Sequence, residues 1–201
     1  FKENQSDYNP YDKKSKKEVE FSLNEIKYEV RDYQEEAIDA LENHNWRGIL
    51  NMATGTGKTL TSLFATERFL KDNPDHVVCI VVPQLHLLYQ WEDVIHNKYK
   101  DIEVLRCAQN KTLWGSKLYR YSRGKRKKQL YILTTYKTLI DDTFQDGMSK
   151  FKDQVIYIFD ECHKLGSNEI KRQLSINDNS KRIGLSATPN RWLDKEGNIF
   201  I

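Results

Sequence analysis

The sequence predicts an α/β fold, in which a mostly parallel central sheet carries helices on both faces. Two observations support this prediction. Segments with the apolar pattern of strands alternate along the chain with segments of helical periodicity, and residues 76–82 form a nearly continuous apolar run. Such a run is typical of a central parallel strand that is buried on both faces. Repeated strand-then-helix units imply right-handed crossovers, so ligands are expected at the carboxyl ends of the strands.

The individual elements follow from the periodicity, taken in chain order. Residues 1–20 are polar and lysine-rich, and we expect a peripheral lead-in there, followed by one domain over residues 21–201. The apolar residues of 32–41 recur at helical spacing, and those of 47–51 have the pattern of a strand. The same reasoning predicts helices over 60–70, 84–98 and 137–151 and strands over 76–82, 102–107, 130–135, 155–159 and 182–186.

Composition limits the class of protein. The chain has 201 residues, of which 38% are hydrophobic and 30% charged, as expected of a soluble protein with one full core. No segment approaches the roughly 18 apolar residues of a membrane span, and the charged start is unlike a signal peptide, so we expect a cytoplasmic protein without a membrane partner. Three widely spaced cysteines indicate neither disulfides nor a zinc site. Because the chain begins at Phe1, we also expect a piece of a longer protein.

Residues 52–59, with the sequence MATGTGKT, have the features of a phosphate-binding loop. Gly55 and Gly57 let the backbone wrap around a phosphate, and Lys58 supplies a positive charge. Thr59 is at the start of a helix, whose positive end favours an anion, and the Thr59 hydroxyl can ligate Mg²⁺. The general pattern has a glycine where this chain has Met52, and the alternative is a plain glycine turn between a strand and a helix. The sequence therefore predicts nucleoside triphosphate binding, with contacts from Thr54, Gly55, Thr56, Gly57, Lys58 and Thr59.

Two carboxylates emerge together from the end of the predicted strand 155–159. Asp160 and Glu161 directly follow that apolar run, and Cys162 and His163 come next. We expect Asp160 to hold Mg²⁺ and Glu161 to orient or deprotonate an attacking water. The alternative is an acidic strand end that caps the following helix.

With both elements in place, the chain resembles the first RecA-like domain of a superfamily 2 helicase or translocase of the DExH kind, with DECH as its box. The resemblance covers about residues 30–192. It implies that ATP and Mg²⁺ are the cofactors and that Lys58, Asp160 and Glu161 carry out hydrolysis. Arg31 and Gln34 lie in a segment that resembles the R-x-Y-Q element, in which the glutamine reads the adenine edge.

Further signatures of the same family follow in the expected order. Residues 186–188 resemble the S-A-T motif, which implies that His163, Ser186 and Thr188 couple the nucleotide site to the nucleic-acid site. Two strand-end segments resemble motifs that contact a nucleic-acid backbone, and they contribute Pro83, Gln84, Thr134 and Thr135.

The segment 184–191 is similar to one found in type I and type III restriction-enzyme motor subunits and in related DNA-repair helicases, a group that mostly moves along double-stranded DNA. We therefore expect double-stranded DNA as the partner, with restriction or repair subunits as further partners. The resemblance also implies a second RecA-like domain in the same polypeptide, without which ATP hydrolysis would be slow. An RNA-directed DExH helicase, a P-loop switch independent of nucleic acid, and a binding module with a decayed ATP site remain alternatives.

A basic and aromatic segment lies at residues 114–128, and it contains no acidic residue. Cations can neutralise phosphates while aromatic faces stack on bases or sugars. The alternative is a solvated loop between two strands. The nucleic-acid contacts expected here are Arg123, Lys125, Arg126, Lys127 and Lys128.

Overall fold

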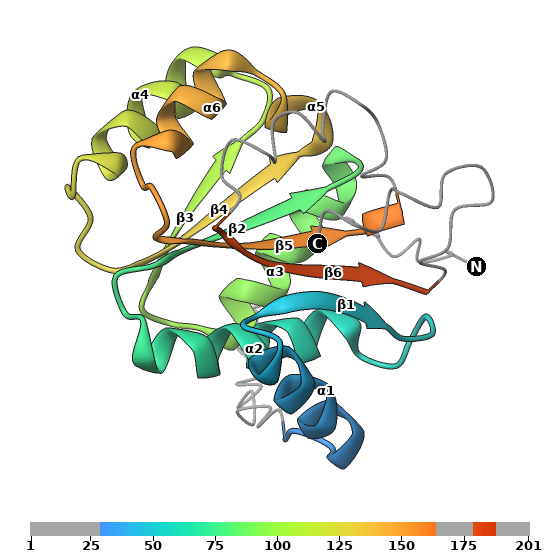
Figure 1. Cartoon of the computed structure of the whole chain (residues 1–201). Helices are drawn as coiled ribbons and strands as arrows, with labels where there is room; N and C mark the ends of the chain where they lie inside the picture. Colours follow the sequence, from blue (N-terminus) through green and yellow to red (C-terminus); the bar gives the residue numbers. More distant parts are fainter. Residues whose placement is uncertain (1–28, 164–178, 188–201) are drawn as a thin grey trace, which may run out of the picture.

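A computed structural model describes residues 29–163 and 179–187, which form one entirely parallel sheet between two layers of helices (Figure 1). All strand pairings are parallel. The six strands, in the spatial order β1-β6-β5-β2-β4-β3, are β1 (Arg47–Asn51), β2 (Val77–Val82), β3 (Ile102–Cys107), β4 (Gln129–Thr135), β5 (Val155–Asp160) and β6 (Lys181–Ser186). The predicted α/β fold is confirmed.

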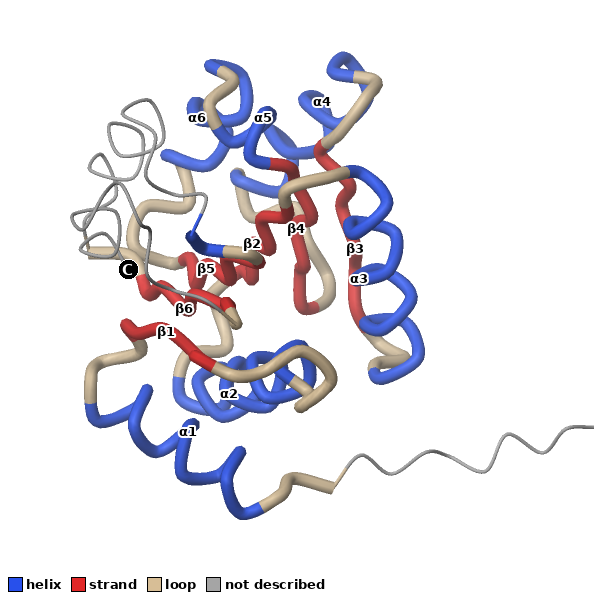
Figure 2. The backbone as a smooth tube through the Cα atoms, turned by 90° about the vertical axis from the view of Figure 1, so that its right-hand side faces the viewer, coloured by secondary structure: helices blue, strands red, loops and turns tan. Residues whose placement is uncertain are grey.

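The helices divide into two layers, one on each face of the sheet (Figures 1 and 2). One face is covered by α1 (Asp32–Asn43), α2 (Lys58–Asp72) and α3 (Leu85–Lys98), and the other by α4 (Lys111–Ser122), α5 (Tyr136–Leu139) and α6 (Asp142–Ser149). None of the helices in these described parts of the chain is long and apolar enough to cross a lipid bilayer.

Strand β2 explains why residues 76–82 read as a continuous apolar run. All six of its side chains are fully buried. Val77, Cys79 and Val81 belong to the core cluster under α4 and α6, whereas its other three residues belong to the cluster under α2 and α3. Because alternate residues of a strand face opposite sides of the sheet, a strand between two helical layers needs apolar residues at every position.

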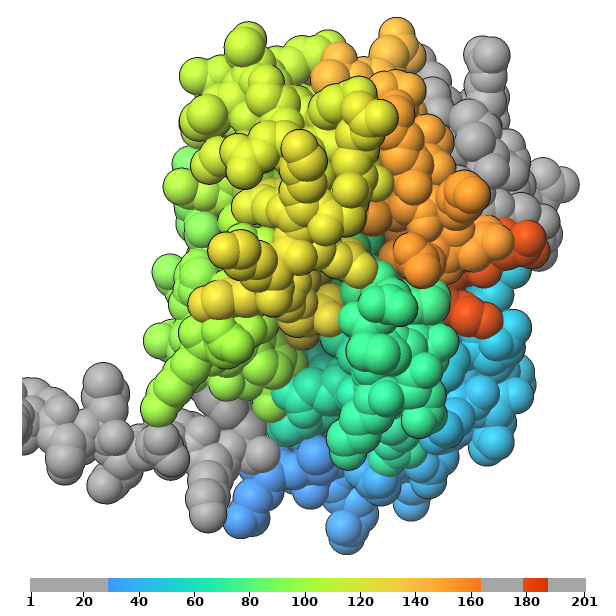
Figure 3. Space-filling model, turned by 90° about the vertical axis from the view of Figure 1, so that its left-hand side faces the viewer, coloured from blue at the N-terminus to red at the C-terminus, as the bar shows by residue number. Residues whose placement is uncertain are grey.

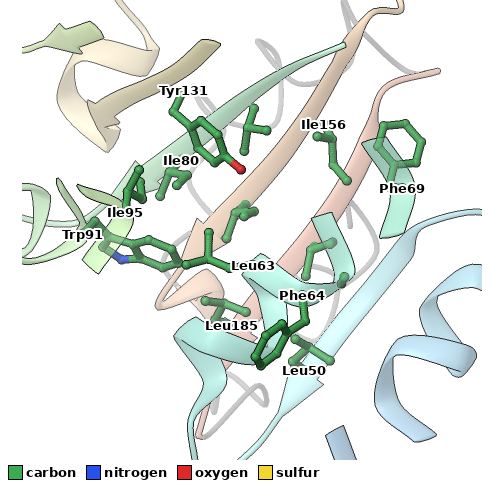
Figure 4. Packing of buried hydrophobic residues seen from close by; sticks show 14 of the residues in the cluster. Leu50, Leu63, Phe64, Phe69, Ile80, Trp91, Ile95, Tyr131, Ile156 and Leu185 are labelled. Atoms are coloured by element: carbon green, nitrogen blue, oxygen red, sulfur yellow. The ribbon is translucent and has the colours of Figure 1, made fainter. Parts of the chain in front are cut away.

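The core beneath α2 and α3 holds the phosphate-loop helix against the sheet (Figure 4). Leu63 and Phe69 of α2 are buried against Ile156 and Leu185 of the central strands. Since α2 begins directly after the predicted phosphate loop, this packing fixes where the start of the helix lies relative to the strand ends.

Helix α4 was not among the helices expected from the sequence, which included none between the strands 102–107 and 130–135. The Asn110 side chain caps it by accepting a hydrogen bond from the Leu113 N–H at 3.2 Å. Trp114 and Leu118, four residues apart, are buried against the sheet and α6, and Trp114 meets Phe144 edge to face. Only these two residues form the apolar face of the helix, and the basic residues around them leave no clear helical periodicity in the sequence.

The parallel strands give the sheet two chemically different edges. All carboxyl ends lie at one edge, on the right in Figure 1 and facing the viewer in Figure 2, and all amino ends lie at the other, which Figure 3 shows. We call these the carboxyl edge and the amino edge; the terms refer to the ends of the strands and not to the outermost strands β1 and β3. A seven-residue strand such as β4 spans about 20 Å, so groups at its two ends are far apart.

Candidate functional site

The predicted phosphate loop connects β1 to α2 at the carboxyl edge. Gly55 and Gly57 have φ angles of 83° and 86°, which L-residues with side chains rarely adopt, so glycine is required for this path of the backbone. Gly57 is the N-cap of α2 and offers no side-chain acceptor, and no acidic residue lies in the first turn. The Thr56 N–H donates to the Ala53 carbonyl at 3.3 Å, and the first turn of the 15-residue helix presents its N–H groups and its positive end to an anion.

Lys58 lies over this loop in the structure. Its Nζ donates to the Met52 carbonyl at 3.0 Å and to the Ala53 carbonyl at 3.4 Å. An ammonium group has three donors and binds phosphate oxygens at least as well as carbonyl oxygens. Phosphate oxygens would thus replace these carbonyls as the partners of Lys58.

Gln34 of α1 braces the loop from the side of the adjacent helix. It is only 4% exposed, and both ends of its amide are used: Nε2 donates to Thr61 Oγ1 at 2.9 Å, and Oε1 accepts from the Arg31 N–H at 3.0 Å. Thr61 Oγ1 in turn donates to the Gly57 carbonyl at 3.0 Å. The side chain to which the resemblance assigns adenine recognition is therefore also a structural link to the phosphate loop.

Tyr33 makes a second link from α1 to the phosphate loop. Its hydroxyl donates to the Thr56 carbonyl at 2.8 Å, while 40% of the residue stays exposed. A cavity lies beside this contact, lined by residues of α1 and of the loop: Glu29, Val30, Arg31, Tyr33, Gln34, Gly55, Thr56, Gly57 and Leu60. In the sequence Tyr33 is the tyrosine of the R-x-Y-Q element, but no role was expected of its hydroxyl.

Asp160, at the end of β5, is fixed by three hydrogen bonds. Its Oδ2 accepts from the Trp91 indole at 2.9 Å, its Oδ1 accepts from the Glu161 N–H at 3.0 Å, and its carbonyl accepts from the Tyr136 hydroxyl at 2.9 Å. Burial, assisted by Cys162 and the two carboxylates, holds the pKa of Tyr136 well above its ordinary value, so this hydroxyl stays a donor. Trp91 lies in the helix expected over residues 84–98, but nothing in the sequence connected it to Asp160.

The pair expected to hold Mg²⁺ lies around a single cavity. Thr59 from the start of α2 and Asp160 from the end of β5 both line it, together with Leu60, Leu87, Gln90, Trp91 and Val94. Each carboxylate oxygen of Asp160 keeps a free lone pair beyond its hydrogen bond. A hydroxyl and a carboxylate are oxygen ligands of the kind Mg²⁺ prefers, so these residues fit that ion.

Glu161 and His163 connect the end of β5 with the end of β6. His163 Nδ1 lies 3.3 Å from Glu161 Oε2 and 3.3 Å from Ser186 Oγ. The Ser186 carbonyl also accepts a hydrogen bond from the Met52 N–H at 3.2 Å, which joins β6 to the phosphate loop. Thr188, the other residue expected in the coupling role, lies outside the described residues.

The predicted backbone-contacting residues meet in a second hollow of the carboxyl edge. Pro83, Gln84 and Thr135 line it, from the ends of β2 and β4, and so do Lys137 and an ion pair of Lys111 with Asp141 at 2.7 Å. We call this hollow the strand-end groove. The side chain of Thr134 does not reach it, because this residue is fully buried and its hydroxyl donates to the Cys107 carbonyl at 3.1 Å. Successive side chains of a strand point to opposite faces, so Thr134 is buried whereas Thr135 remains partly exposed.

The basic residues expected to bind nucleic acid lie elsewhere, at the amino edge, where the loop after α4 leads into β4. Lys128 pairs with Asp101 at 2.6 Å, and Arg126 donates to the Asp75 carbonyl; both acidic residues precede strands. The structure does not bring Arg126 and Lys128 together with Pro83, Gln84 and Thr135, although Trp114, at the start of the same basic and aromatic segment, lines the strand-end groove.

The sequence is similar to a known protein family and to curated proteins. The sequence profile described as "Type III restriction enzyme, res subunit" matches residues 27–191. The DNA 3'-5' translocase XPB2 of Sulfurisphaera tokodaii is 32% identical over 171 residues, which are 85% of this chain and 33% of that protein. The chain thus spans about a third of the length of this relative.

Two solved structures share the fold at lower sequence identity. A nuclease-deletion mutant of the Type ISP restriction-modification enzyme LlaGI, in complex with a DNA substrate mimic, has a TM-score of 0.65 at 24% identity, over 83% of this chain and 18% of that one. The Sulfolobus solfataricus SWI2/SNF2 ATPase core in complex with dsDNA has a TM-score of 0.58 at 22% identity, over 88% and 36%.

Proposed function

The chain belongs to the superfamily 2 family described as type III restriction enzyme, res subunit, and on that premise we propose that it is the ATP-binding half of a motor acting on double-stranded DNA. The observation that carries the proposal is the spatial order of the strand ends. β1, β6 and β5 are neighbours in the sheet, and they carry the phosphate loop, Ser186 and the Asp160-Glu161 pair. β2 and β4 lie next to them and carry the strand-end groove.

In this proposal the triphosphate lies on the N–H groups of residues 54–59, and Lys58 exchanges its carbonyl partners for phosphate oxygens. The adenine occupies the cavity beside Arg31, Tyr33 and Gln34. The contact of the Tyr33 hydroxyl with the loop supports this placement, because it holds one wall of that cavity to the phosphate site.

Hydrolysis needs a positioned water and a way to balance negative charge. Mg²⁺, held by Thr59 and Asp160, would neutralise charge on the phosphate oxygens. Glu161 orients the water and accepts its proton. His163 Nδ1 lies 3.3 Å from both Glu161 and Ser186, so a change in the charge of the Glu161 carboxylate is transmitted through His163 to the end of β6.

DNA is proposed to lie along the strand-end groove, with its phosphates near Lys137, Gln84 and Thr135. The groove combines Lys137 and the Lys111–Asp141 ion pair with uncharged hydrogen-bonding groups, and Lys137 with those groups suits contacts to a sugar-phosphate backbone more than reading of bases. The restriction enzyme and the ATPase core with the same fold were both solved with DNA or a DNA mimic, which supports this choice over RNA.

A second RecA-like domain of the same polypeptide would complete the ATP site with an arginine finger, and restriction or repair subunits would be further partners. Absence of such a finger lowers phosphoryl-transfer rates by about 10³–10⁵. We therefore expect this chain alone to bind ATP but to hydrolyse it slowly.

The test compares the wild type with Lys58→Ala. Binding of a fluorescent ATP analogue is titrated with and without Mg²⁺, and binding of duplex DNA and of duplex RNA is titrated in parallel. We expect Lys58→Ala to abolish nucleotide binding but to leave duplex DNA binding in the absence of nucleotide unchanged. A nucleotide affinity that does not respond to this substitution would contradict the ATP site, and tighter binding of RNA than of DNA would contradict the choice of substrate.

A further inference from the structure

The basic segment at the amino edge carries four cations that the strand-end groove does not use. Lys117 and Arg120 of α4 and Lys125 and Lys127 of the following loop are exposed, and within the described residues none of these four makes an ion pair. We call these four residues the amino-edge surface. They lie in the yellow-green and yellow segment that faces the viewer in Figure 3.

This surface is held in place by its neighbours. Arg126 donates to the Asp75 carbonyl in front of β2, and Lys128 pairs with Asp101 in front of β3. Arg123 stacks on Tyr119, with its guanidinium carbon 5.3 Å from the ring centroid, and also donates to the Tyr119 hydroxyl at 2.7 Å. The loop is therefore tied to two strand starts and to α4, and this leaves the remaining cations directed to solvent.

The strand-end groove and the centre of the amino-edge surface lie at opposite ends of the sheet. Arg120, Lys125 and Lys127 lie between the last turn of α4 and the start of β4, whose seven residues span about 20 Å, whereas Lys117 lies in the middle of α4. Figure 1 shows the strands running between the loop after α4 and the ends of β2 and β4. A backbone that follows the groove stays at the carboxyl edge.

The composition of the surface favours a phosphate backbone over an acidic protein. Protein interfaces need a desolvated apolar centre and are poor in lysine. In residues 114–128 the apolar Trp114 and Leu118 are buried, and Tyr119 is the exposed large side chain. Three of the four free cations are lysines, and the segment contains no acid. Such a surface suits the non-specific neutralisation of phosphates.

We propose that the amino-edge surface is a second duplex-DNA contact, separate from the strand-end groove and independent of ATP. This proposal rests on the proposed function only in taking DNA as the partner. A motor with two such contacts can hold a distant or looped part of its DNA while the groove holds the part along which it moves.

The test uses the whole chain and a short duplex hairpin, and it counts the duplexes that bind to each chain at saturation. The amino-edge variant carries Lys117→Gln, Arg120→Gln, Lys125→Gln and Lys127→Gln. The logarithm of the duplex binding constant falls with the logarithm of the salt concentration, with a slope of about 0.9 per neutralised phosphate. We therefore expect the slope for this variant to be smaller by about 3 to 4, with and without an ATP analogue. We expect two duplexes to bind per wild-type chain and one per variant chain.

Two controls isolate the effect. A charge-retaining variant, with the three lysines changed to arginine and Arg120 to lysine, should keep both the slope and the second duplex. A groove variant, Gln84→Ala with Lys137→Gln, should lose the other duplex and keep the amino-edge one. If the groove variant binds as the wild type while the amino-edge variant loses DNA, the groove part of the proposed function fails and the amino-edge contact stands.

Two outcomes would overturn the proposal. One is an unchanged salt slope and an unchanged number of bound duplexes in the amino-edge variant. The other is a polyglutamate peptide that binds the wild type more tightly than the duplex does and is lost in the amino-edge variant, since that would assign the surface to an acidic protein segment.

Discussion

The indole Nε1 of Trp91 donates a hydrogen bond of 2.9 Å to Oδ2 of Asp160, across 69 residues of sequence. Trp91 is 3% exposed and lies on α3, the helix that starts at the strand-end groove. Asp160 ends β5 beside the phosphate loop. The bond therefore joins the helix that follows the proposed DNA contact to the carboxylate proposed to hold the metal.

Trp91→Phe removes the donor and keeps an aromatic ring. Loss of a hydrogen bond to a charged group costs about 1.5–3 kcal/mol, so we expect a lower free energy of unfolding in urea. We also expect Mg²⁺ to strengthen nucleotide binding less than in the wild type, because the Asp160 carboxylate keeps only the Glu161 N–H as a donor, and calorimetric titrations with and without Mg²⁺ measure this. Trp114→Phe, in the core cluster on the other face, is the control. An equal response to Mg²⁺ in Trp91→Phe and Trp114→Phe would contradict the role of the bond.

Gln34 and Thr61 form a buried pair whose coupling can be measured directly. Gln34→Ala leaves the Arg31 N–H without its acceptor, and removing a buried partner costs about 1–3 kcal/mol. We expect this loss in the absence of any nucleotide. A double-mutant cycle with Thr61→Val should give a coupling free energy of about 0.5–1.5 kcal/mol. Additive effects of the two changes would show that the amide does not brace the loop.

Gly55 and Gly57 give a matched test of the loop. Both have positive φ, but a Cβ on Gly57 would lie 3.0 Å from Gln34 Nε2, whereas a Cβ on Gly55 would meet nothing within 4 Å. Left-handed backbone costs about 1–2 kcal/mol for alanine, so we expect both substitutions to destabilise and Gly57→Ala to do so more. Urea unfolding measures the difference. Adding Gln34→Ala to Gly57→Ala should remove part of the extra cost, and no such relief would argue against the contact.

Glu161→Gln separates hydrolysis from binding. The amide keeps the size of the side chain but cannot accept a proton, and loss of a general base lowers rates by about 10²–10⁴. Because turnover of the chain alone is expected to be slow, the decay of bound ATP is followed in a single turnover with protein in excess. We expect a slower decay with ATP affinity close to that of the wild type. Glu92→Gln, which removes an ion pair with Arg106, is the control and should decay as the wild type does.

Much of the fold could be read from the sequence because the elements have strong local signals. The buried strands β2 and β5 are uninterrupted apolar runs, and the expected limits 102–107 and 47–51 match β3 and β1. Helix α4 was missed because only Trp114 and Leu118 face the core and cations surround them. The helix is stabilised by the contacts of these two side chains with the core, and such contacts cannot be recognised from the neighbouring sequence.

The sequence by itself determined the loop chemistry and the acidic strand end, since glycines, a lysine and paired carboxylates at fixed spacing are recognisable without a structure. The tertiary structure alone decided what lies beside what. It placed the Trp91 indole on Asp160, turned Thr134 into the core, and put the basic loop 123–128 about 20 Å from the strand-end groove. The physical reason is that spacing along the chain defines local geometry, whereas crossovers and strand order define which ends of the sheet are neighbours.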